Sequence, residues 1–228
     1  MHTLTRFRLD WKVMKAVMIT TGAVISGSVA LAVLLGGEFV AQDLDIYVVA
    51  EHMGTVLVFL EEQGYKVIIP SPNAKKNGCP TSTVTLTLKN NAGEKIDLTA
   101  TTERHIVYTI TKFHSTCVMN YVAYYGIVCL YPAWTMCGTA LLRGEPTDQQ
   151  AIEKYRGRGF AMKTDASEMP GYEPNHKCAA HQCCPQTRRE LHDHVTLCVP
   201  LEDKEWNIKT EEKMRVGWVL QNDARSDD

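Results

Sequence analysis

Residues 1–50 alternate between helical and extended patterns of apolar positions. Apolar side chains recur at helical spacing in residues 10–18, so we expect a helix there. Residues 23–25 form a short apolar strand, and the Ser-Gly-Ser sequence at 26–28 is a tight turn whose last serine can cap a second helix at 29–35. Residues 44–49 are rich in β-branched and aromatic side chains, which predicts a further strand.

The next part of the chain predicts a helix followed by a β-hairpin. Residues 54–65 have a helical pattern that ends at Gly64, and a strand at 65–70 leads into a polar loop at 70–80. Residues 83–101 give the clearest hairpin, because apolar and polar residues alternate on both sides of an Asn-Asn-Ala-Gly-Glu turn.

After the hairpin the patterns become shorter. The elements that we expect there, in order, are a strand at 105–113, a helix that begins at Ser115 and carries residues 118–122, an extended piece at 127–132, and helices at 134–144 and 146–155.

The character of the sequence changes near residue 160. The elements of residues 1–160 predict an α/β (α+β) domain in which a small mixed β-sheet is flanked by helices. Residues 161–228 are polar and rich in cysteine and histidine. We therefore expect a Cys/His-rich C-terminal extension, either separate or packed on the same domain.

One alternative is a membrane anchor at the N-terminus. No side chain is charged from Ala16 to Gly37, a length that could span a bilayer, and several basic residues precede the run. The run also contains threonine, serine and glycine and few leucines, which makes its insertion free energy marginal. Two elements around a turn explain it better, so we do not expect a membrane partner.

The overall charge disfavours a long nucleic acid as partner. The 228-residue chain has 24 Lys and Arg against 26 Asp and Glu, a formal net charge of -2, whereas such binders usually carry a basic surplus. The basic stretches at 6–15 and 155–160 are short and are typical of a solvated helix face and a solvated loop. Four of the eight cysteines are scattered in the first 160 residues and no secretory signal is recognisable, which predicts an intracellular protein, cytoplasmic or nuclear.

Three aspartates are the main candidates for chemistry. Asp43 and Asp45 stand two positions apart in a predicted strand, so both side chains leave the same face of the sheet. Neighbouring carboxylates repel each other unless a cation lies between them, and Mg²⁺ favours carboxylates together with substrate phosphates. Asp97, in the returning strand of the hairpin, would add a third carboxylate if the two strands are neighbours. Three such groups could hold two metal ions for phosphoryl or nucleotidyl transfer.

The turn formed by Ser26, Gly27 and Ser28 offers a complementary phosphate site. At the start of a helix, free backbone N–H groups and a hydroxyl face outward and can bind an anion. Gly27 would let the backbone approach the ligand closely.

Together these features resemble the signature of the nucleotidyltransferase superfamily. That signature combines a Gly-Ser or Gly-Gly strand-to-helix turn, an acid–apolar–acid triplet and a third acid on a nearby strand. The matches are Gly27-Ser28, Asp43-Leu44-Asp45 and Asp97, within residues 10–110, although the interval between turn and triplet is slightly longer than usual. Residues 113–132 are also similar to a stretch in uncharacterised fungal proteins that share the turn and triplet.

The resemblance implies a nucleotidyltransferase-like fold and a site for a nucleoside triphosphate. It assigns the triphosphate to Gly27 and Ser28, with Ser26 beside them, and Mg²⁺ or Mn²⁺ to Asp43 and Asp45. Asp97 would be a third metal ligand or the base. The implied activity moves a nucleoside monophosphate to an acceptor that the sequence does not identify. Members of the superfamily often lose catalysis, so an inactive binding module is the second hypothesis.

A cluster of cysteine and histidine residues in the extension could hold a structural zinc ion. Thiolate and imidazole are the ligands that zinc prefers, and a polar segment gains stability from a bound metal. The spacing matches no strong zinc-finger pattern, so a surface loop with free thiols remains the alternative. The candidate ligands are Cys178, His181, Cys183, Cys184, His192 and His194, with His176 just before them.

The pair Arg188 and Arg189 lies inside this cluster. It could contact phosphates from a short helix, or it could belong to a solvated turn, which is the commoner case for such a charged stretch.

Overall fold

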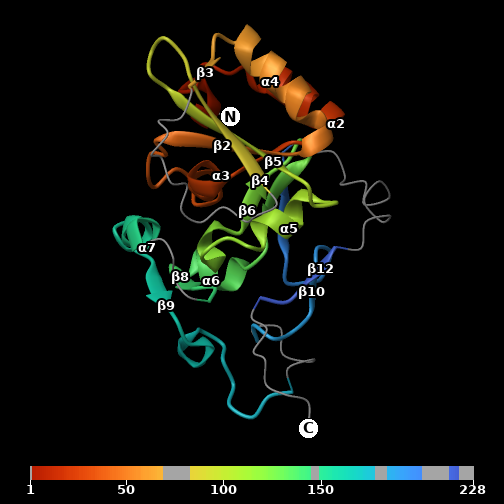
Figure 1. Ribbon diagram of the computed structural model, residues 1–228. Helices are drawn as coiled ribbons and strands as arrows, with labels where there is room; N and C mark the ends of the chain where they lie inside the picture. Colours follow the sequence, from red (N-terminus) through yellow and green to blue (C-terminus); the bar gives the residue numbers. More distant parts are fainter. Residues whose placement is uncertain (1, 69–82, 145–148, 178–183, 202–215, 221–228) are drawn as a thin grey trace.

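The computed structural model describes residues 2–68, 83–144, 149–177, 184–201 and 216–220 (Figure 1). Within these residues the main sheet has eight strands, in the order β11-β7-β6-β1-β2-β5-β4-β3. In that order they are β11 (Leu197–Pro200), β7 (Gly126–Cys129), β6 (Asn120–Val122), β1 (Val24–Ser26), β2 (Asp43–Val49), β5 (Lys95–Thr101), β4 (Thr83–Lys89) and β3 (Lys66–Val67). β2 and β5 are parallel and their other pairings are antiparallel. The expected mixed sheet with flanking helices is confirmed.

The helices of the described residues are mostly short. They are α1 (His2–Thr5), α2 (Trp11–Thr21), α3 (Gly27–Leu34), α4 (Met53–Glu62), α5 (Ile106–Ile110), α6 (Pro132–Met136) and α7 (Gln149–Arg156), with 3-10 turns η1 (Ala50–His52), η2 (Thr116–Val118) and η3 (Ala166–Glu168). Two small sheets add β8 (Thr139–Leu141) with β9 (Ala161–Lys163), and β10 (Arg189–Glu190) with β12 (Gly217–Trp218).

One face of β2 and β5 forms the core. In β2 the side chains of Leu44, Ile46 and Val48 are fully buried and those between them are half-buried, which is the alternation of a strand with one apolar face. Helices α2 and α4 lie side by side over the apolar face and contribute buried methionine, valine and leucine side chains (Figure 1). The aspartates of β2 therefore project from the opposite face.

The uncharged run at 16–37 is divided among three elements. Helix α2 ends at Thr21, and Gly22 adopts the left-handed conformation (φ 65°) that closes it. Strand β1 and helix α3 follow. Within the described part of the chain, no helix combines the length and apolarity needed to cross a bilayer.

The start of α3 differs from the expectation in one detail. Ser26, and not Ser28, is the N-cap residue, and its side chain makes no capping hydrogen bond. Ser28 lies in the first turn and is buried. The strand–turn–helix arrangement itself is as expected, and it places Gly27 at the junction.

The strand expected at 105–113 is wrong, because this segment contains helix α5. Nδ1 of His105 accepts a hydrogen bond from the backbone N–H of Val107 and caps the helix. Ile106, Val107 and Ile110 are buried against the second face of the sheet. Burial of several β-branched side chains on one short helix outweighs their strand propensity.

The predictions of a helix that begins at Ser115 and of a helix at 134–144 are also wrong for most of their residues. Residues 116–118 form only the 3-10 turn η2, and Tyr121 and Val122 belong to β6, where Val122 pairs with Ile25 of β1. In the segment 134–144, helix α6 stops at Met136 because Gly138 adopts a left-handed conformation (φ 65°). Strand β8 follows it.

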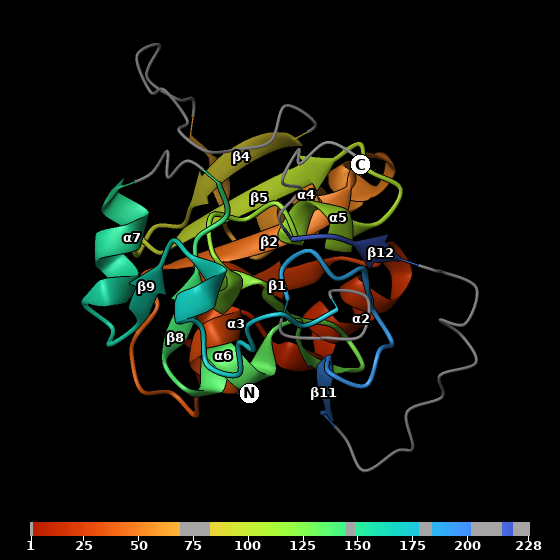
Figure 2. The ribbon, with the colours of Figure 1, turned by 90° about the horizontal axis from the view of Figure 1, so that it is seen from below.

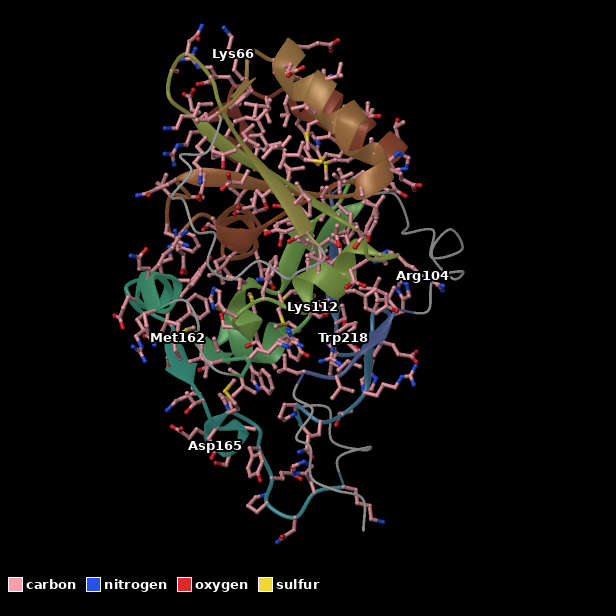
Figure 3. The ribbon with its side chains drawn as sticks, viewed as in Figure 1. Lys66, Arg104, Lys112, Met162, Asp165 and Trp218 are labelled. Atoms are coloured by element: carbon pink, nitrogen blue, oxygen red, sulfur yellow. The ribbon has the colours of Figure 1, made fainter. Side chains whose placement is uncertain are left out.

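The described parts of the Cys/His-rich extension contact the preceding domain at separate places. Strand β9 pairs with β8, and β11 extends the main sheet beside β7. Figures 1 and 2 place α7 and β9 at the same edge of the molecule. Figure 3 shows Met162 of β9 and Trp218 of β12 on opposite sides of the structure. The boundary near residue 160 stays a prediction, and the loop expected at 70–80 lies outside the described residues.

Candidate metal centre

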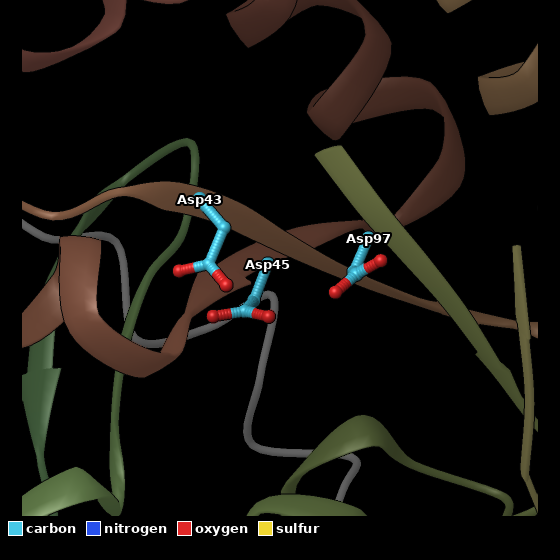
Figure 4. A group of neighbouring side chains, drawn as sticks. All are labelled: Asp43, Asp45 and Asp97. Carbon is cyan, nitrogen blue, oxygen red and sulfur yellow. The ribbon is translucent and has the colours of Figure 1, made fainter. Parts of the chain in front are cut away.

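The three predicted aspartates come together on the second face of the sheet. Parallel pairing of β2 with β5 sets Asp45 opposite Asp97 and Asp43 opposite Lys95. One carboxylate oxygen from each of Asp43, Asp45 and Asp97 can be chosen so that all lie within 4.8 Å of one another. Figure 4 shows the three carboxyl groups on the same side of the two strands. The spacing suits coordination of a common cation by oxygen ligands.

Lys95 was not recognised as a site residue from the sequence. Its ammonium nitrogen lies 2.7 Å from Oδ2 of Asp97 and 3.7 Å from Oδ2 of Asp43. Lys95 stands two positions before Asp97 in β5, so it shares the face of the aspartates, and this spacing is the signal that could have revealed it. The ammonium supplies part of the positive charge that the cluster requires.

Asp97 is held in place by a second contact. The hydroxyl of Thr87, opposite it in β4, donates a hydrogen bond of 2.5 Å to Oδ1 of Asp97. Both carboxylate oxygens of Asp97 therefore accept hydrogen bonds, one from Thr87 and one from Lys95. These contacts orient the carboxylate toward the cluster.

Asp43 and Asp45 carry the signs of an unsatisfied negative site. Burial, followed by the charges of Asp43 and Asp97, raises the pKa of Asp45 to about 7, against the opposing effect of Lys154 and Lys95. Oδ1 of Asp43 is buried and accepts no hydrogen bond from the described residues. A divalent cation would offset the repulsion between the carboxylates and would give Oδ1 of Asp43 a partner, so the residues present fit Mg²⁺ or Mn²⁺.

Gly27 brings the α3 turn against the carboxylates. Its φ is 63°, and a Cβ atom at this position would lie 2.2 Å from Oδ2 of Asp45. Only glycine allows both this backbone conformation and this approach. The close approach that the structure shows is to Asp45; an approach of the Gly27 backbone to a ligand stays a prediction.

The two serine hydroxyls of the turn contact protein groups. The hydroxyl of Ser26 donates a hydrogen bond of 2.6 Å to the carbonyl oxygen of Asn120. The hydroxyl of Ser28 lies 3.4 Å from that of Tyr155 and accepts a hydrogen bond of 3.2 Å from Arg158. Both serines are buried. Their role in phosphate binding stays a prediction.

A second group missed by the sequence analysis comes from α7 and the residues after it. The stretch 155–160 was expected to be a solvated loop, but Tyr155 and Phe160 are buried and Arg158 reaches Ser28. Nothing in the local pattern connects residue 158 with residue 28, so only the folded chain reveals this contact.

The zinc hypothesis is largely untested. Cys178, His181 and Cys183 lie outside the described residues. Cys184 is buried, and within the described part of the chain neither it nor His192 or His194 belongs to a group of three potential metal ligands. Zinc binding stays a prediction.

Of the two arginines Arg188 and Arg189, Arg189 has a structural role. Arg189 is buried, and its guanidinium binds Asp193 and the carbonyl oxygen of Leu130. Arg188 is exposed. Neither residue lies in a helix, because β10 begins at Arg189.

Comparisons with known proteins give one structural similarity. No family model and no curated protein matches the sequence. Among solved structures, a CCA-adding enzyme in complex with CTP is similar, with a TM-score of 0.44 and 13% sequence identity. The alignment covers 71% of this chain and 42% of the enzyme, so the chain spans about two fifths of that enzyme's length. A likeness of this degree carries no argument about activity, and the function must be argued from the geometry of the site.

Proposed function

We propose that this protein is an Mg²⁺-dependent nucleotidyltransferase, which moves a nucleoside monophosphate from a nucleoside triphosphate to an acceptor. The observation that carries the proposal is the convergence of Asp43, Asp45 and Asp97, from two adjacent parallel strands, beside the Gly27 turn. Three carboxylates next to a helix start combine cation ligands with donors for phosphate.

Each residue has a role that follows from its contacts. Asp43 and Asp45 would hold the metal ion, and Asp97 would complete its ligands. When bound, the ion neutralises charge on the phosphates and on the attacking and leaving oxygens. The Gly27 turn positions the phosphates through backbone N–H groups. Because Thr87 and Lys95 both donate to Asp97, the role of metal ligand is favoured for that residue over that of a base.

The reaction conserves atoms and charge in a simple exchange. A hydroxyl oxygen of the acceptor forms a bond to the α-phosphorus of the nucleotide. The bond from that phosphorus to the bridging oxygen of the β-phosphate breaks, and pyrophosphate leaves. The hydroxyl proton is released to water. The acceptor could be a small molecule, a protein side chain or an RNA end, and the net charge of -2 disfavours the last.

The second candidate function is a catalytically inactive module that binds nucleotides. The specific observation in its favour is Lys95, whose ammonium already bridges Asp97 and Asp43 in part. A protein in which a lysine supplies the positive charge of a metal ion could retain the nucleotide site without catalysing nucleotidyl transfer.

A nucleotide panel with Mg²⁺ or Mn²⁺ separates the two functions. The measurements are binding of each nucleoside triphosphate, time-dependent release of pyrophosphate, and transfer of label to protein, RNA and small acceptors. The variants are Asp43→Asn and Asp45→Asn, with Asp165→Asn as the control because Asp165 is exposed and lies at the other end of the structure from β2 and β5 (Figures 1 and 3).

Each outcome of this panel decides between the hypotheses. Pyrophosphate release that falls about 100-fold or more in Asp45→Asn but not in Asp165→Asn supports the enzyme. Metal-dependent binding without release supports the inactive module. Absence of both binding and release in the wild-type protein would overturn both functions.

A further inference from the structure

The side chain of Arg158 is fixed between two aromatic rings at the edge of the candidate site. Its Cζ atom lies 4.1 Å from the centre of the Phe39 ring and 5.1 Å from that of the Tyr155 ring. Phe39 belongs to the segment between α3 and β2, whereas Tyr155 belongs to α7. Contacts with aromatic faces hold the planar guanidinium in one orientation and leave its N–H edge available for hydrogen bonds.

The guanidinium is directed at the start of α3. Nη1 donates a hydrogen bond of 3.2 Å to the hydroxyl of Ser28, the residue after Gly27. Gly27 in turn lies against Asp45. Arg158 and the three aspartates therefore flank the same turn, and the two groups have opposite charge.

Arg158 has no carboxylate partner within 4.0 Å among the residues that the structure describes. Arg156, two positions earlier, does have such a partner. Its Nη1 lies 2.6 Å from Oε1 of Glu153, on the exposed side of α7. A guanidinium has several donors in a fixed fork, and the Ser28 hydroxyl uses one of them. The remaining donors of Arg158, which is half-buried, are free to bind an anion.

Lys154 adds a second positive charge on the same side. Its ammonium lies 5.8 Å from the centre of the Tyr155 ring, and the described residues offer it no ion pair. Lys154 and Arg158, which both lie beside the Tyr155 ring, form the basic side of the site.

We propose that Arg158, held by Phe39 and Tyr155 and assisted by Lys154, is an anion-binding subsite for the phosphate chain of the ligand. The subsite rests on the proposed function in that the ligand is a nucleotide whose metal-bound end lies at the aspartates. A phosphate chain offers the oxygens that an arginine fork binds best. The α7 segment is then a part of the nucleotide site and not a peripheral helix.

The test measures binding of tripolyphosphate to the metal-free protein in the presence of EDTA. This probe has no base and no bound metal, so its affinity reports the basic side of the site alone. The variants are Arg158→Gln and, as the matched control, Arg156→Gln. Arg158→Lys keeps the charge but loses the planar fork, and urea unfolding of each variant identifies any that fails to fold.

We expect Arg158→Gln to weaken tripolyphosphate binding about tenfold or more, since a hydrogen bond between charged groups is lost. Arg156→Gln should bind within about twofold of wild type. Arg158→Lys should fall between them, which keeps the test valid if Arg158→Gln is unstable. Asp45→Asn should bind tripolyphosphate more tightly than wild type without metal, because a repelling charge is removed.

Wild-type affinity in a folded Arg158→Gln variant, or no tripolyphosphate binding by the wild-type protein, would overturn the subsite. Equal losses in Arg156→Gln and Arg158→Gln would also overturn it, because they would indicate a nonspecific charge effect. Failure of the proposed function has a different signature: Arg158-dependent binding of tripolyphosphate persists, while no nucleoside triphosphate is bound or consumed with Mg²⁺.

Discussion

At the scale of single residues, Gly27 and Asp45 constrain each other directly. The left-handed conformation of Gly27 carries the chain from β1 into α3, and the missing side chain leaves the space that a carboxylate oxygen of Asp45 fills. Asp45 is half-buried, and burial is the largest cause of its raised pKa. The absence of a side chain at Gly27 thus lets the turn before α3 lie against the carboxylate of Asp45.

Gly27→Ala should weaken metal-dependent nucleotide binding. The added Cβ would lie 2.2 Å from Oδ2 of Asp45, so the carboxylate must move. Gly93→Ala is the matched control: its φ is 87°, and nothing lies within 4 Å of the added Cβ. Both variants should lose about 1–2 kcal/mol of unfolding free energy through backbone strain, measured with urea. Only Gly27→Ala should lose about tenfold or more in affinity, and equal binding by the two variants would contradict this role of Gly27.

The raised pKa of Asp45 predicts a pH-dependent stability in the metal-free protein. The carboxyl group ionises near 3.8 when unfolded and near 7 when folded. Between these values the folded state holds a proton that the unfolded state has released, so the free energy of unfolding falls as pH rises from about 4 to about 7. We expect a fall of about 2 kcal/mol relative to Asp45→Asn, after allowance for the partial access of water to the site.

Urea unfolding of wild type and Asp45→Asn in EDTA, at several pH values, checks this prediction. A constant difference between the two proteins across the range would contradict it. Excess Mg²⁺ should reduce the slope, because a bound cation favours the ionised carboxylate.

At the scale of elements, the site depends on a long-range parallel pairing. The hairpin of β4 and β5 is local, but β5 must also lie beside β2, from which α4 and β3 separate it in the chain. Helix α4 crosses the apolar face together with α2 and covers both strands. Packing of α2 and α4 therefore supports the register that sets Asp45 opposite Asp97.

Helix α2 should be sensitive to loss of its N-cap. The carboxylate of Asp10 accepts hydrogen bonds from the backbone N–H groups of Lys12 and Val13, at 2.8 and 3.1 Å. Asp10→Ala should lower the free energy of unfolding by about 1 kcal/mol, whereas Asp10→Asn should retain most of it. Urea unfolding measures both, and an equal loss in the two variants would indicate that the cap hydrogen bonds are not the cause.

At the scale of the whole molecule, the C-terminal residues help to complete the core of the domain. Arg189 lies between the rings of Tyr131 and Trp218, with its Cζ atom 5.1 and 5.7 Å from their centres. The indole N–H of Trp218 donates a hydrogen bond of 2.8 Å to the hydroxyl of Tyr131. Burial alone would raise the pKa of Asp193, but Arg189 and further hydrogen bonds lower it. The contacts of Arg189 with Leu130 and Tyr131, and of Trp218 with Tyr131, therefore join the extension to the residues around β7, and Asp193 holds Arg189 in place.

Arg189→Gln should destabilise the protein by about 3 kcal/mol, because it leaves Asp193 without its cationic partner in a partly buried place. The neighbouring Arg188→Gln is the matched control, and an exposed arginine should cost no more than about 0.5 kcal/mol. Thermal or urea unfolding measures the difference. Equal stability of the two variants would show that the buried contacts of Arg189 do not stabilise the folded protein.

The sequence by itself determined the features that arise from local periodicity. Alternation of apolar and polar residues in β2 and β5 separates a core face from a carboxylate face, and it predicted that Asp43 and Asp45 point the same way. The glycine at the start of α3 and the hairpin turn are equally local, because each depends on the conformations open to a few adjacent residues.

Only the tertiary structure decided which segments meet. Short apolar stretches such as 105–113 can bury the same side chains as helix or strand, so packing and not propensity selects α5. Three features of the site join residues that are distant in sequence or that meet only through the strand register. They are the pairing of β2 with β5, the contact of Lys95 with Asp43 and Asp97, and the hydrogen bond from Arg158 to Ser28. Such pairings depend on the summed free energy of the whole core, which no local pattern contains.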